Sequence, residues 1–209
     1  MHVDNNFPAP LQVMAFLGSA MVAGVLVLAT VYGLLRRKTW VKRTLMILGG
    51  GSVVYFGLLF AFSQASKDVT LGRGNEKYFC EIDCHLAYSI TDVKTIGEGP
   101  SQALAVTVRT RFDESTISSR RLKNAPVSPG PREVVLVDMT GRRHFSMSRQ
   151  GSSLEKELIP GQSYTTTLIF PVAQVEPGMR LLITSPGGPV PLLIGNEMSF
   201  EHKKTYLGL

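Results

Sequence analysis

The sequence predicts a membrane protein in which a hairpin of two transmembrane helices precedes an all-β sandwich. Three observations lead to this fold class. Two long uncharged segments occupy most of the first 66 residues, five basic residues separate them, and the remainder alternates short β-type runs with glycine and proline turns. The 44% hydrophobic content of the 209 residues therefore combines an apolar N-terminal third with a polar remainder.

Residues 11–35 and 44–65 are the two predicted transmembrane helices. At 1.5 Å per residue the first segment covers about 37 Å, more than the roughly 30 Å of a hydrocarbon core. The second is also long enough to cross with some tilt. Two uncharged runs of this length argue against buried helices of a soluble core. Neither run contains Asp, Glu, Lys, Arg or His, which argues against an ion or proton pathway through this chain alone.

The connector 36–43 predicts the orientation of the hairpin. Its basic residues are Arg36, Arg37, Lys38, Lys42 and Arg43, whereas residues 1–10 contain a single charged residue, Asp4. Short basic loops stay in the cytoplasm, so we expect both termini and the C-terminal domain in the periplasm of a bacterial inner membrane. The N-terminal tail lacks the basic region of a secretory signal, so we expect the first helix to be retained as an anchor.

The net charge of +6 mainly reflects this connector. After residue 65 the chain has 17 Lys and Arg against 15 Asp and Glu, without a basic cluster on one face. We therefore expect no nucleic-acid partner.

Small residues lie one turn apart on both predicted helices, and they let helix backbones approach closely. They include Gly18, Ala20, Gly24, Gly49, Gly50 and Gly51. Two interpretations stay open: the two helices pack on each other, or one of these faces docks on helices of another subunit.

Residues 66–85 predict a polar linker and cysteine loop, and residues 86–209 predict the sandwich with a polar C-terminal tail. Leu104, Val106 and Val108 alternate with polar residues, as expected for a strand with one buried face. Residues 134–147 predict a hairpin around a Thr-Gly turn. The seven expected strands lie within 86–96, 102–112, 132–139, 142–148, 163–172, 179–185 and 189–195.

Residues 86 to 195 resemble the bacterial telokin-like, immunoglobulin-like extracellular family of unknown function. The resemblance lies in an aspartate-x-x-glycine hairpin, a leucine, a proline-glycine turn and a phenylalanine that ends a strand, here Asp138, Gly141, Leu158, Pro160, Gly161 and Phe170. It implies an immunoglobulin-like sandwich outside the cytoplasm and carries no catalytic residues. Members are often lipoproteins, whereas this chain has a helical anchor, and Asp113 replaces an asparagine common in the family.

The segment from Cys80 to His85 contains both cysteines. An oxidising periplasm permits a disulfide between Cys80 and Cys84. In a flat strand these residues would be about 13 Å apart, beyond the 4.4 to 6.8 Å between Cα atoms that a disulfide needs, so the intervening residues must turn.

Haem and copper are the alternatives for Cys80, Cys84 and His85. Covalent haem attachment normally uses C-x-x-C-H, and this segment has one residue too many. The C-x-x-x-C spacing resembles the copper loop of oxidase second subunits, but Tyr88 and Thr91 occupy the places of its histidine and methionine. We favour the disulfide, with no metal or cofactor.

Catalytic motifs are missing from the sequence: it contains no G-x-S-x-G elbow, P-loop, dinucleotide fingerprint or H-E-x-x-H. Asp113 and Glu114 are expected to be solvated. The leading hypothesis is a non-enzymatic accessory subunit that braces other integral membrane subunits and their periplasmic domains, for example in a photosynthetic or respiratory electron-transfer complex. The alternative is a periplasmic redox, copper or haem module at Cys80, Cys84 and His85, and a third is a ligand-binding module on the sandwich loops.

Overall fold

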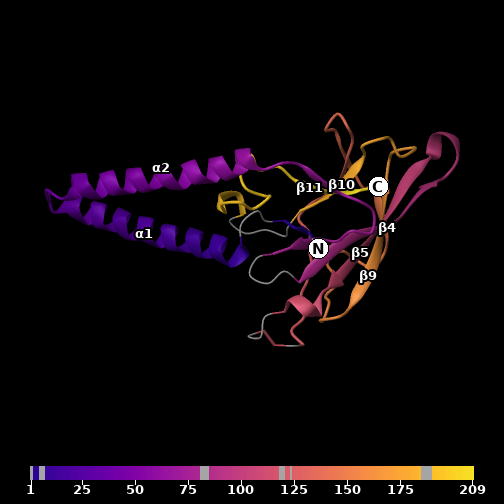
Figure 1. Ribbon diagram of the computed structural model, residues 1–209, viewed down its shortest axis with the longest axis horizontal. Coiled ribbons are helices and arrows are strands. Elements are labelled where there is room, and N and C mark those ends of the chain that lie inside the picture. Colours follow the sequence, from indigo (N-terminus) through magenta and orange to yellow (C-terminus); the bar gives the residue numbers. More distant parts are fainter. Residues whose placement is uncertain (1, 5–7, 81–84, 118–120, 123, 185–189) are drawn as a thin grey trace.

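The computed structural model describes the whole chain except residues 1, 5–7, 81–84, 118–120, 123 and 185–189 (Figure 1). Two long helices project side by side from one end of a two-sheet β-sandwich, and their connecting loop lies at the tip farthest from the sandwich (Figure 1). The predicted class of two apolar helices followed by a β-sandwich is confirmed.

The helices are α1 (Ala9–Leu35) and α2 (Val41–Ala65), and both are long and apolar enough to cross a membrane by length and composition. The second begins three residues earlier than predicted, so Lys42 and Arg43 lie in its first turn rather than in the connector. The Thr30 hydroxyl donates to the Thr44 hydroxyl at 3.0 Å and aligns the two helices near the tip.

The first sheet has six strands in the order β1-β3-β4-β5-β9-β8, and the second has five in the order β2-β11-β10-β6-β7. The first comprises β1 (His2–Val3), β3 (Lys77–Phe79), β4 (Leu86–Ile96), β5 (Ala103–Phe112), β9 (Ser163–Phe170) and β8 (Ser148–Gly151). The second comprises β2 (Val69–Leu71), β11 (Thr205–Gly208), β10 (Arg180–Ile183), β6 (Val134–Val137) and β7 (Arg143–Phe145). Short 3-10 turns are η1 (Gly99–Ser101), η2 (Glu114–Thr116) and η3 (Val190–Leu192).

The hydrophobic core lies between the two sheets. Strand β5 places Leu104, Val106 and Val108 in it without solvent exposure, as the alternation predicts, and Leu168 and Phe170 of the neighbouring β9 are equally buried. These long alternating strands account for the centre of the six-stranded sheet.

The predicted hairpin joins β6 to β7, and Asp138 organises its turn. One carboxylate oxygen of Asp138 accepts the Thr140 and Arg142 backbone N–H groups, both at 2.9 Å, and the other lies 3.0 Å from His144 Nε2. Gly141 has a φ of 83°, which favours glycine. The aspartate-x-x-glycine motif is therefore a turn device in this chain.

Several strand predictions were wrong. Of the predicted strand 189–195, the described residues 190–195 contain η3 and no strand, because Pro191 lacks the N–H group that a sheet ladder needs. The expected tail contains β11, which lies between β2 and β10, and the expected linker contains β2 and β3. The sandwich therefore also includes strands that precede residue 86.

Candidate functional site at the junction of the helices and the sandwich

The two described ends of the cysteine segment occupy different surroundings. Cys80 follows β3 and is buried, and its backbone N–H donates to Asp4 Oδ1 at 3.1 Å. His85 precedes β4, and its ring centroid lies 4.7 Å from that of Phe112. Cys84 lies outside the described residues, so the disulfide and the metal set of Cys80, Cys84 and His85 both stay predictions. Among the described residues, no group of three or more His, Cys, Asp and Glu could hold a metal ion.

Cys80 belongs to the contact that joins α1 to the sandwich. It forms a small buried cluster with Ala9, Tyr78 and Ala87, against which Val3 packs. Ala9 is the first residue of α1, whereas Tyr78 and Ala87 are opposite each other on β3 and β4. The start of the first helix is therefore fixed directly on the six-stranded sheet.

A buried lysine joins the two sheets at the same end of the sandwich. The Lys77 side chain on β3 is fully buried, and its Nζ donates to the carbonyl oxygens of Ile183 at 2.8 Å and Thr205 at 2.9 Å. These acceptors lie on β10 and β11 of the opposite sheet. The third partner is Glu197 Oε1 at 2.5 Å, in a pair that excludes solvent almost completely.

Glu197 connects this lysine to the N-terminal segment. Its second carboxylate oxygen accepts the Thr205 N–H at 3.1 Å, and its own N–H donates to the Asp4 carbonyl at 3.0 Å. Burial, reinforced by the negative charge of Glu197, raises the pKa of Asp4 to about 7. Burial also lowers the pKa of Lys77, although Glu197 opposes that shift. Sequence reasoning missed Lys77, Glu197 and Asp4 as a group, because only the fold brings them together.

A second polar network lies on the outer face of the six-stranded sheet. Arg111 donates to both carboxylate oxygens of Glu76, at 2.8 and 2.7 Å, and to Asp113 Oδ2 at 3.0 Å. The Tyr78 hydroxyl also donates to Asp113, at 2.6 Å. Burial would raise the pKa of Asp113, but hydrogen bonds from Tyr78, Ser115 and Arg111 outweigh it and lower that pKa. The expectation that Asp113 is solvated was therefore wrong.

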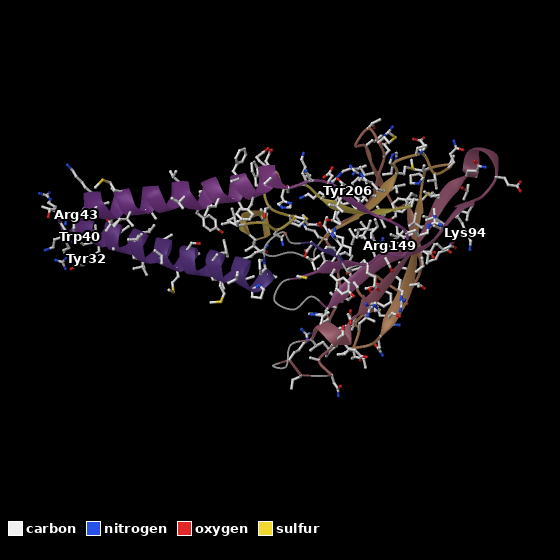
Figure 2. All side chains as sticks on the ribbon, in the orientation of Figure 1. Tyr32, Trp40, Arg43, Lys94, Arg149 and Tyr206 are labelled. Atoms are coloured by element: carbon white, nitrogen blue, oxygen red, sulfur yellow. The ribbon has the colours of Figure 1, made fainter. Side chains whose placement is uncertain are left out.

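The basic residues predicted to set the orientation gather at the tip of the hairpin. Figure 2 shows Arg43 and Trp40 there, at the opposite end of the molecule from Lys94. The remaining members, Arg36, Arg37, Lys38 and Lys42, belong to the same turn and the adjoining start of α2. The chain thus has one basic end, then two long apolar helical stretches without charged residues, and then the sandwich.

The predicted glycines do not form the close contact between the two helices. Ala20 and Gly51 line an apolar hollow of about 300 Å³ between the helices. The predicted glycines have open space where a side chain would stand: a Cβ atom added there would meet no described atom within 4 Å outside its own stretch of helix. These glycines are Gly18, Gly24, Gly49, Gly50 and Gly51. The close approach of the helices lies instead at Gly33, where a Cβ atom would come within 2.6 Å of Val41 Cγ2.

Both helices expose apolar side chains around most of their circumference. Only 6% of the apolar stretch of each helix is buried within the chain. The exposed side chains include Met14, Met21, Leu28, Met46, Val53 and Phe60. A surface of this kind is unfavourable in water and favourable in lipid or against other apolar helices.

Comparisons with known proteins give one structural likeness. No protein family matches the chain, and no curated protein matches it. The chain is similar to the crystal structure of MPT63, a secreted protein from Mycobacterium tuberculosis, with 12% identity and a TM-score of 0.36 over 58% of this chain and 100% of that chain. The strand pairings within the chain establish the two-sheet sandwich independently of this likeness.

Proposed function

We propose that this protein is a non-catalytic, membrane-anchored accessory subunit that braces a larger membrane complex on its extracytoplasmic side. The observation that carries the proposal is the contrast between the two parts of the chain. The sandwich buries its own core, whereas the helices leave nearly all of their apolar surface outward. The helices therefore need an apolar environment, which a bilayer and the helices of other subunits provide.

The distribution of charge supports the proposed orientation. Five basic residues at the tip favour a cytoplasmic tip, and the sandwich then lies in the periplasm of a bacterial inner membrane. An oxidising periplasm would also favour the Cys80–Cys84 disulfide. Membership of the telokin-like, immunoglobulin-like family belongs to the same proposal, as does a photosynthetic or respiratory electron-transfer complex as the host.

The open glycine faces support helix docking as the mode of assembly. Gly49 and Gly50 on α2 have free space where a side chain would stand, so another helix could approach the backbone closely. The proposed partners are other integral membrane subunits, which would contact these faces, and their periplasmic domains, which would contact the sandwich.

Extraction in a mild detergent followed by native electrophoresis tests the proposal. We expect the tagged protein to migrate in an assembly much larger than its own 22.8 kDa, and Gly50→Leu to reduce that assembly. Val53→Leu is the matched control, because it adds volume at an exposed position of the same helix that already carries a side chain. Migration as a free monomer under all mild conditions would contradict the proposal.

A further inference from the structure

The loop between β10 and β11 packs against the outer half of α2. The Tyr55 hydroxyl on α2 donates to the Leu192 carbonyl at 2.7 Å, and Leu192 lines the hollow between the helices together with Phe16 of α1. In Figure 1 this yellow-orange segment lies beside the end of α2 nearest the sandwich. Leu192 of this loop therefore lies against both helices.

The position of Tyr55 along α2 gives the depth of this contact. Tyr55 is 12 residues beyond Arg43, the last charged residue of the basic end, which corresponds to about 18 Å of helix. A hydrocarbon core of roughly 30 Å that starts near Arg43 extends about 12 Å beyond Tyr55. The Leu192 carbonyl, within hydrogen-bonding distance of Tyr55, is therefore at the level of the outer leaflet.

The surface of the loop is apolar at this level and charged beyond it. Pro191, Leu192 and Phe200 are exposed, and the Phe200 side chain is 66% exposed. They surround a second apolar hollow of about 420 Å³ together with Phe56, Leu59 and Phe60 of α2. Glu201 follows at once and is exposed, as are Lys67 and Lys203. This order, apolar and then charged, matches the change from acyl chains to headgroups.

Three consecutive backbone carbonyl groups of the loop have hydrogen-bond partners. Irregular backbone at membrane depth is tolerated only where its polar groups have partners. The Pro191 carbonyl accepts the Phe200 N–H at 3.1 Å, the Leu193 carbonyl accepts the Asn196 N–H at 3.3 Å, and the Leu192 carbonyl accepts the Tyr55 hydroxyl.

The loop is also tied to the sandwich. Glu197 pairs with Lys77, so the loop that carries Leu192 and Phe200 is held by the sandwich. A loop fixed in this way holds Leu192 and Phe200 in place without help from the bilayer.

We propose that Pro191, Leu192 and Phe200 of this loop enter the outer leaflet beside α2, with Leu192 and Phe200 against lipid acyl chains and Glu201 among the headgroups. The proposal rests on the proposed membrane anchoring and adds a third, non-helical element to it. Lipid is the occupant that the structure favours, because the exposed loop side chains continue the apolar surface of Phe56 and Phe60 without a break.

Quenching of tryptophan fluorescence by brominated lipid tests the proposal. The full chain with Trp40→Phe, which removes the only tryptophan, is reconstituted in phosphatidylcholine vesicles brominated near the middle of the acyl chain. Single tryptophans are then placed by Phe200→Trp in the loop, by Leu28→Trp in α1 and by Ile96→Trp at the distal end of β4. We expect Phe200→Trp to lose at least about half as much fluorescence as Leu28→Trp, and Ile96→Trp to be unquenched.

The three positions separate the two ways of failing. Quenching of Leu28→Trp without quenching of Phe200→Trp would overturn the inserted loop and leave the helical anchor in place. Absence of quenching at Leu28→Trp as well would overturn the anchor itself. If Phe200→Trp does not fold, as judged by circular dichroism, Leu192→Trp reports on the same loop, and its failure to be quenched would equally overturn the proposal.

Discussion

Removal of the buried lysine should destabilise the sandwich more than any surface substitution. Lys77→Met removes one ammonium group that donates to the Ile183 carbonyl, the Thr205 carbonyl and Glu197 Oε1. It also leaves the Glu197 carboxylate buried without its cation. The substitution keeps the length and much of the apolar stem of the side chain. Its effect should therefore come mainly from the lost charge and hydrogen bonds.

The geometry of the pair gives the size of the effect. The removal of one partner of a buried ion pair typically costs about 3–5 kcal/mol, because the remaining charge is uncompensated. In a chain of this length about 4 kcal/mol corresponds to a fall in Tm of about 8–16 °C, at 2–4 °C per kcal/mol. Lys77→Met/Glu197→Leu should be more stable than Lys77→Met, because the double variant leaves no unpaired buried charge.

Thermal unfolding of the detergent-solubilised protein, followed by near-ultraviolet circular dichroism, measures this effect. Lys94→Met is the matched control, because it breaks the Lys94–Asp92 pair, whose two side chains are 71% and 42% exposed. That substitution should cost under about 1 kcal/mol. A Lys77→Met variant that melts within about 2 °C of the unchanged protein would show that the Lys77–Glu197 pair does not stabilise the sandwich.

Two further predictions concern the same junction. Burial raises the pKa of Asp4 to about 7 from its ordinary value of 3.8, so its contribution to stability is complete below about pH 4 and is lost as the pH rises to about 7. That loss amounts to at most about 4 kcal/mol. Asp4→Asn should therefore flatten the dependence of Tm on pH between 4 and 7. An unchanged dependence of Tm on pH would show that Asp4 is not its source. For the cysteines, we expect the intact purified protein to be lighter than its reduced form by the mass of two hydrogens. A Soret band, or stoichiometric copper lost on Cys80→Ser, would instead favour the redox module.

The long elements of the fold could be predicted because each contains its own signal. Uncharged runs of more than 20 residues specify the helices, and 8 to 11 residues of alternating or β-branched sequence specify β4, β5 and β9. Strands β2, β3 and β11 have only three or four residues each, too few for a period to emerge. Strands β2 and β11 pair with each other from opposite ends of the sandwich sequence, which no local pattern predicts.

Only those residues of the candidate site that have a local sequence signal could be predicted. The cysteines and the basic connector stand out in the sequence because of their residue types and spacing. Lys77 has no such signal, since a lysine that follows Asn75 and Glu76 is typical of a solvated linker. Its burial depends on Glu197, which is 120 residues away, and on two carbonyl groups of the opposite sheet. The apolar run at 189–195 predicts a strand by composition, whereas the position of Leu192 beside Tyr55 of α2 depends on the tertiary fold.

The hairpin is proposed to cross the membrane with its basic tip inside and the sandwich outside. Protease treatment of intact spheroplasts that contain the C-terminally tagged protein measures this most directly. We expect the protease to digest the sandwich and to spare the connector from Arg36 to Arg43. Neutral substitutions at the five basic residues of the connector should produce mixed topologies. A sandwich that stays protected until the membrane is permeabilised would contradict the proposed orientation.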